Sequence, residues 1–161
     1  MTVRKLLFVA CSLLVFGSLT MAQGKVDTKF HCPKESVSHK LDVGDVPGHS
    51  YMILQGTCNV TSSDRSFPEK TGVYTEFLEA WKTSFNFHGR WNITMDNGDK
   101  VYYTYEGSAP TDMTKPLSWK WKILSGTGKY KGIKGSGTIS GKYNADGSFD
   151  GECTGTYSIS K

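Results

Sequence analysis

Apolar and polar residues alternate with a period of two over long stretches of the chain, which is typical of β-strands with one buried face. In the clearest run, residues 84–95, every second residue is apolar or glycine and the residues between them are mostly polar. Segments 117–124 and 149–159 follow the same rule. Weaker strand patterns cover five further segments: 36–43, 51–61, 73–82, 100–107 and 135–143. The pattern therefore predicts eight strands.

Turn signals separate these segments, notably Pro47-Gly48 and the loops at 96–99 and 144–147. Short turns join antiparallel neighbours. An even set of long strands with one buried face leaves no exposed edge when it closes on itself. We therefore predict an all-β fold, an eight-stranded antiparallel closed β-barrel. Residues 23–32 are interpreted as a short ordered or semi-ordered lead-in to it.

Glycine is concentrated in residues 125–141, Ser-Gly-Thr-Gly-Lys-Tyr-Lys-Gly-Ile-Lys-Gly-Ser-Gly-Thr-Ile-Ser-Gly. Such density weakens helices and permits positive φ angles and close backbone approach, so it predicts a tight corner between two strands. Phosphate-binding loops also contain glycines. However, Gly126, Gly128 and Gly132 do not have the dinucleotide spacing, and no Gly-Lys-Ser/Thr opens a helix.

Three segments carry a family resemblance: 97–102, 105–107 and the corner at 126–138. They are similar to the strand and corner pattern of the allene oxide cyclase and dirigent barrel group, which includes secreted bacterial proteins of unassigned function. The resemblance covers about a third of the chain. It implies a calycin-like barrel, and a cofactor-independent isomerase or cyclase is one activity of that group. No catalytic position of the family is matched within residues 23–82, so no active-site residue is carried over.

The first 22 residues have the features of a secretory signal peptide. Arg4 and Lys5 precede a mainly apolar stretch, 6–19, and small residues follow at 20–22. That stretch is shorter than the roughly 20 residues that span a bilayer. We therefore predict cleavage before Gln23, a single barrel domain over residues 23–161, a secreted or periplasmic location, and no membrane attachment of the mature chain.

The net charge of the mature chain argues against nucleic-acid binding and excludes little else. Without the signal peptide the chain has 17 Lys and Arg against 15 Asp and Glu, and the lysines of 115–134 occupy outward strand positions rather than a basic stripe. The four histidines lack the spacing of metal ligands. No cofactor motif is present in the sequence. The sequence leaves open a homo-oligomer and glycosylation at the Asn59 and Asn92 sequons.

Three cysteines lie beyond the signal peptide, so at most one intramolecular bridge forms and one thiol remains. If the first two strands form a hairpin turning near 44–47, the numbers of paired residues sum to about 90–92. That register places Cys32 near Cys58 and predicts a bridge between them. Cys153 lies on the apolar face of the last strand, where we interpret it as an inert, small apolar residue.

Candidate chemistry is sparse. Continuing the alternation from Val73 places Glu79 on an apolar face, where burial would raise its pKa and suit it to proton transfer. The competing face of that segment contains Tyr74, Glu76, Leu78 and Ala80, so a bulge or an exposed Glu79 remains the alternative.

The sequence supports two functional classes, ligand binding and catalysis, and a third in which the barrel has only a structural role. The first is a secreted barrel that binds a small apolar ligand among the lumen aromatics Trp91, Tyr103, Trp119 and Trp121. The second is an isomerase or cyclase in which Glu79 or a lumen tyrosine such as Tyr103 moves a proton. The third is a filled barrel with a structural role. An empty apolar lumen favours binding, and a buried glutamate beside tyrosines favours catalysis.

Overall fold

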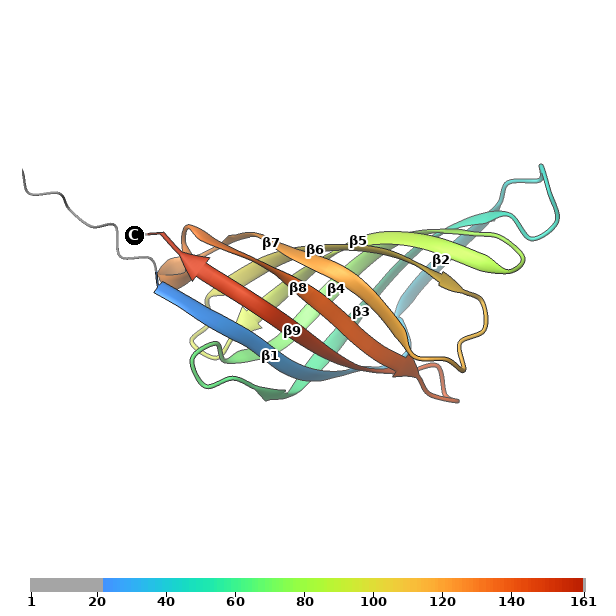
Figure 1. Ribbon diagram of the computed structural model, residues 1–161. Coiled ribbons are helices and arrows are strands. Elements are labelled where there is room, and N and C mark those ends of the chain that lie inside the picture. Colours follow the sequence, from blue (N-terminus) through green and yellow to red (C-terminus); the bar gives the residue numbers. More distant parts are fainter. Residues whose placement is uncertain (1–21, 161) are drawn as a thin grey trace, which may run out of the picture.

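A computed structural model describes residues 22–160, which form an antiparallel β-barrel (Figure 1). The predicted signal peptide falls outside the described residues apart from its last position. The strands are β1 (Ala22–Cys32), β2 (Val37–Asp42), β3 (Ser50–Ser63), β4 (Glu69–Ala80), β5 (Ser84–Met95), β6 (Lys100–Pro110), β7 (Leu117–Gly126), β8 (Ile133–Tyr143) and β9 (Phe149–Ile159), with a single 3₁₀ turn, η1 (Gly128–Tyr130), in the described part.

Hydrogen bonds between strands close the sheet. Its order is β1-β9-β8-β7-β6-β5-β4-β3-β2, and β1 also pairs with β3. Eight strands therefore form a continuous antiparallel ring, and β2 is an additional strand that pairs with residues 50–55 of β3, beyond the part of β3 that pairs with β1. The predicted closed eight-stranded barrel is confirmed.

Two strand assignments differ from the prediction. Residues 23–32 are not a lead-in but belong to β1, which pairs with β9 from Ala22↔Ile159 to Cys32↔Phe149. Its inward residues include Val26 and Phe30, both buried. Conversely, the predicted strand at 36–43 became β2, in which every residue is exposed, because β1 takes its place in the ring.

The predicted register of the first hairpin is confirmed, and so is the disulfide. Val37 pairs with Gln55, and their residue numbers sum to 92. His31 of β1 pairs with Asn59, and their residue numbers sum to 90, so both pairs agree with the predicted sum of 90–92. The next position along β1 is opposite Cys58, and Cys32 and Cys58 are bonded. The bridge therefore ties the first strand of the ring to β3. Cys153 is a free, buried thiol, and burial holds its pKa well above the ordinary value.

The glycine-rich segment forms the corner that its sequence predicts, running from β7 through η1 into β8. Gly128 and Gly132 have φ angles of +52° and +79°, which side chains other than glycine rarely adopt. At Gly135 the reason is space, since a Cβ would lie 2.6 Å from the carbonyl oxygen of Thr156 on β9.

Large side chains fill the half of the barrel nearest η1, which we call the closed half. Trp121, Tyr103, Phe67 and Ile93 have at most 1% of their surface exposed there. Phe67, in the β3–β4 connection, meets the ring of Tyr130 edge-on at 5.5 Å and covers this end. This half of the interior is a packed core, whereas the other half is hollow.

Candidate functional site

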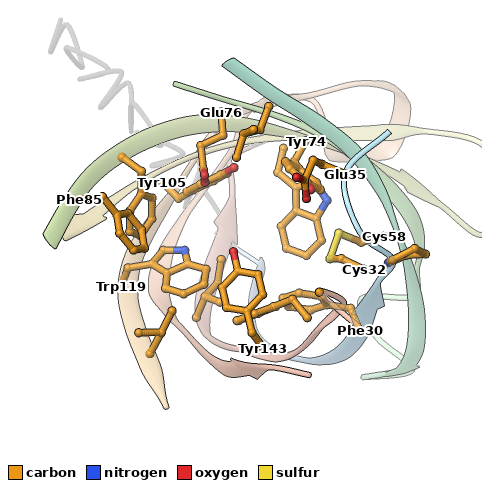
Figure 2. Close-up of a pocket in the computed structure, with 18 residues that line it drawn as sticks. Phe30, Cys32, Glu35, Cys58, Tyr74, Glu76, Phe85, Tyr105, Trp119 and Tyr143 are labelled. Atoms are coloured by element: carbon orange, nitrogen blue, oxygen red, sulfur yellow. A yellow bond between two sulfur atoms is a disulfide. The ribbon is translucent and has the colours of Figure 1, made fainter. Parts of the chain in front are cut away.

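A pocket occupies the end of the barrel opposite η1, which we call the open half (Figure 2). Its cavity is about 80 Å³, several times the roughly 10–15 Å³ that holds one water. Cys32 and Cys58 border it on one side, and the β1–β2 connection contributes Glu35 at the rim. The aromatic residues that line it are Phe30, Tyr74, Phe85, Phe87, Trp91, Tyr105, Trp119, Tyr143 and Phe149.

The strand alternation directs these rings inward, and glycines on neighbouring strands make room for them. Phe87 and Trp119 meet edge-on with their centroids 5.3 Å apart. Gly107 lies beneath both, because a Cβ there would come within 2.7 Å of atoms of each. Phe30 packs edge-on against Trp91 at 4.7 Å. The walls are therefore rigid and mostly apolar, as in small-molecule sites.

One carboxyl group lies within this apolar surface. Glu76 of β4 enters the pocket from the same side as Tyr105 of β6, and the Tyr105 phenol is close enough to affect the pKa of the carboxyl (Figure 2). Burial raises the pKa of Glu76 to about 7, with the Tyr105 phenol opposing the rise and the Glu35 carboxylate adding to it. Glu76 is therefore divided between acid and base forms near neutral pH, as general acid–base catalysis requires.

The phenols around Glu76 stay protonated. Burial, with the nearby Glu35 and Glu76 carboxylates, raises the pKa of Tyr74 to about 12. Burial also raises the pKa of Tyr105, again with Glu76 contributing. Each phenol is thus a hydrogen-bond donor at physiological pH. Among the described residues that line the pocket, none is a lysine or arginine.

Two indole groups of the wall have spare donors. The Nε1 atoms of Trp91 and Trp119 are buried and have no hydrogen-bond partner within residues 22–160. A buried donor without a partner costs about 1–3 kcal/mol. Both tryptophans line the cavity, so a water or ligand that accepts a hydrogen bond there would remove that cost.

The four aromatics predicted as ligand-binding divide between the two halves. Trp91 and Trp119 line the pocket, whereas Tyr103 and Trp121 are in the closed half and do not reach it. Tyr103 donates a 2.6 Å hydrogen bond to Glu69 Oε1, and burial raises the pKa of that carboxyl. The prediction missed this division because periodicity shows that a side chain points inward but not which level of the barrel is filled.

Of the two alternatives for Glu79, the structure supports the exposed one and not the buried acid. Glu79 faces outward with 30% of its side chain exposed, and it accepts a hydrogen bond from the His49 ring at 3.1 Å. His49 also contacts Asp45 at 2.7 Å, and these two carboxylates raise its pKa, the Asp45 hydrogen bond most. The competing face of β4 points inward instead, because pairing with both β3 and β5 sets its register.

The ionisable pocket residues that sequence reasoning missed as site residues are Glu35, Tyr74, Glu76, Tyr105 and Tyr143. The sequence did contain a signal for Glu76, because Glu76 belongs to the competing face of the segment that became β4. Both faces of that strand carry apolar residues, and Val73 and Phe77 are exposed at 41% and 37%. Local periodicity could not choose between the two faces.

No group of three or more histidine, cysteine, aspartate or glutamate residues within the described chain is arranged to hold a metal ion. In residues 22–160 there is also no helix of the length and apolar character needed to cross a bilayer.

Comparison with known proteins identifies the fold. Neither the protein-family models nor the curated proteins contain a match to this sequence. Among solved structures, the chain is similar to the pterocarpan synthase dirigent protein GePTS1, with a TM-score of 0.53 and 13% identity over 96% of this chain and 98% of that one. A pyocyanin demethylase matches with a TM-score of 0.44 and 15% identity over 83% of this chain and 99% of that one. The chain thus shares the barrel fold of dirigent proteins.

Proposed function

We propose that this protein binds a small, largely apolar molecule in the open half of its barrel. The observation that supports this most is the pocket itself, a cavity walled by aromatic rings within a barrel whose other half is packed. A barrel with a purely structural role has no need of a hollow half. Eight strands leave room for one small molecule or for side chains, and this chain uses the interior for both.

Leu54 offers a direct test, because it lines the pocket from β3 while its neighbour Ile53 points outward and is 49% exposed. We expect Leu54→Trp to fill the cavity and weaken the binding of neutral aromatic fragments by at least about tenfold, or about 1.4 kcal/mol. Ile53→Trp adds the same side chain outside the barrel and should leave binding unchanged. Native mass spectrometry, with intrinsic tryptophan fluorescence as a second readout, measures both.

Equal binding by the parent and Leu54→Trp would show that the fragments bind elsewhere and would overturn the proposal. Screening small-molecule extracts of the source organism against the parent and the blocked variant would then identify the natural ligand as the species that only the parent retains. Thermal unfolding of each variant separates a blocked pocket from a damaged fold.

A second function, a cofactor-independent isomerase or cyclase, is favoured by the pair of Glu76 and Tyr105 in the pocket. These two residues take the proton-transfer role that the sequence analysis considered for Glu79 or Tyr103. The ionised Glu76 carboxylate would take a proton from an acidic C–H of the bound molecule, and the protonated form would return it at another carbon. Tyr105 would stabilise the developing negative charge on a substrate oxygen by donating a hydrogen bond.

This activity has its own readout. A bound substrate with an acidic C–H should exchange that hydrogen for deuterium in heavy water, and mass spectrometry follows the gain of mass. We expect Glu76→Gln to slow the exchange by about 10²-fold or more, the usual contribution of a positioned general base. Exchange that is unaffected by Glu76→Gln would show that Glu76 is not the base and would overturn this assignment.

We also propose that residues 1–22 are removed on export and that residues 23–161 act outside the cytoplasm as one domain. The Cys32–Cys58 disulfide supports this, since such bonds persist mainly in oxidising compartments.

A further inference from the structure

We propose that the molecule bound in the open half carries a basic nitrogen, held as a cation between the carboxylates of Glu35 and Glu76 and the aromatic walls. This inference rests on the proposed function, because it names the class of ligand that the same pocket takes.

The first argument is the balance of charge in the pocket. Glu35 and Glu76 both line it, and Figure 2 shows them on the same side of the opening. Each is close enough to influence the neighbouring Tyr74. Among the lining residues that the structure describes, no lysine, arginine or histidine compensates them. Both carboxylates are half-buried, and a carboxylate that is partly removed from water is stabilised by an opposite charge, so the missing positive charge is one that a ligand can supply.

The second argument is the nature of the walls. An ammonium group is attracted to the face of an aromatic ring, and tryptophan and tyrosine attract it most strongly. The pocket has two tryptophans, Trp91 and Trp119, and three tyrosines close to the two carboxylates. Carboxylates together with aromatic faces form the usual environment of a bound amine. A carboxylate or phosphate ligand would instead face repulsion from both glutamates.

A third observation indicates that the cavity is built for an occupant. Trp91 is only 4% exposed, lines the cavity, and has an Nε1 donor without a partner within residues 22–160. A hydroxyl or carbonyl oxygen on the ligand would accept a hydrogen bond from it. The best match is therefore a small aromatic or aliphatic amine that also carries an oxygen acceptor.

Binding of a cation has a defined pH dependence. The groups that face Glu76 are Tyr105 on β6, Tyr74 on β4, Tyr143 on β8 and Glu35 from the β1–β2 connection. The pKa of Glu76 is about 7. An ammonium binds its ionised form, so affinity increases as pH rises through that value. A neutral ligand that accepts a hydrogen bond from the protonated acid has the opposite dependence.

Three compounds of nearly equal size and shape test the charge: benzylamine, benzyl alcohol and benzoate. We expect the mature parent protein to bind benzylamine at least about tenfold more tightly than benzyl alcohol, and benzoate most weakly. Between pH 6 and pH 8 the affinity for benzylamine should rise about tenfold, as ionisation of one group with a pKa of about 7 requires. Isothermal titration calorimetry measures the affinities and the protons released.

Glu76→Gln should weaken benzylamine binding and abolish its pH dependence, and the double variant Glu35→Gln/Glu76→Gln should reduce it to the level of benzyl alcohol, whose own binding stays unchanged. The matched control is Glu106→Gln, the same change at an exposed, outward position one residue after Tyr105, which should alter neither. Unchanged binding of benzyl alcohol also shows that the Glu76→Gln pocket is intact.

The outcomes distinguish this inference from the proposed function. Equal binding of the three compounds, or preference for benzoate, overturns the inference and leaves the proposed function standing. Selective amine binding that survives the double variant Glu35→Gln/Glu76→Gln also overturns it, because the charge would then act elsewhere. Failure of all three compounds and of the wider fragment set to bind overturns the proposed function, and the inference with it.

Discussion

Replacing Trp121 with alanine is expected to lower the free energy of unfolding by about 3–5 kcal/mol, the usual cost of removing a fully buried large aromatic side chain. Trp121 is 1% exposed and meets Tyr103 edge-on at 5.3 Å. Its indole lies over the paired Gly137 and Gly155, where a Cβ on either would come within 2.5 Å of Trp121 Cζ2. The two glycines have no side chains to move into the space, so the cavity would remain.

Urea unfolding measures this change, with Lys122→Ala as the control. Lys122 is the next residue on β7 but points outward and is exposed, so its removal should change stability by less than about 0.5 kcal/mol. Because Trp121 does not line the pocket, the alanine variant should also keep its ligand affinity. A loss of stability below about 1 kcal/mol would contradict the packing described for the closed half.

Removing the Cys32–Cys58 bridge should be the next largest loss, about 2–4 kcal/mol, since the bond joins residues 26 positions apart and restricts the unfolded chain. The double variant Cys32→Ala/Cys58→Ala avoids new pairing with Cys153. Its unfolding midpoint in urea, compared with that of the oxidised parent, gives the difference.

Reducing agent provides the control for this second prediction. It should destabilise the parent to about the level of the double variant and leave the double variant unchanged. Thiol counting should find one free thiol in the denatured parent, which is Cys153. A parent whose stability does not respond to reduction would show that the bond adds nothing beyond the strand pairing around it.

The sequence predicted the barrel well where one face of a strand is clearly more apolar than the other. In β5 the inward residues are large and the outward residues polar, so the alternation determined both the strand and its buried face. The first strand was missed although Val26, Thr28, Phe30 and Cys32 do alternate with polar residues. The segment was interpreted as a lead-in, although Pro33 separates it from the strand pattern that begins at residue 36.

The candidate site was less accessible to sequence reasoning, for two physical reasons. The buried face of β4 depends on hydrogen bonds to β3 and β5, whose registers are set by the whole ring, so Glu79 was chosen in place of Glu76. The level of a residue along the barrel axis depends on strand tilt, which has no local signature. Trp119 and Trp121 are two residues apart, yet only Trp119 lines the pocket.

The pairing of β1 with β9 also affects how the barrel folds. Ala22 meets Ile159 and Cys32 meets Phe149, so the ring closes between segments at opposite ends of the described chain. Contacts so distant in sequence impose a large loop-closure entropy, and barrels rich in them fold in milliseconds to seconds. Until β9 is present, β1 can pair only with β3, so a partly folded chain exposes two unpaired sheet edges, which favour aggregation.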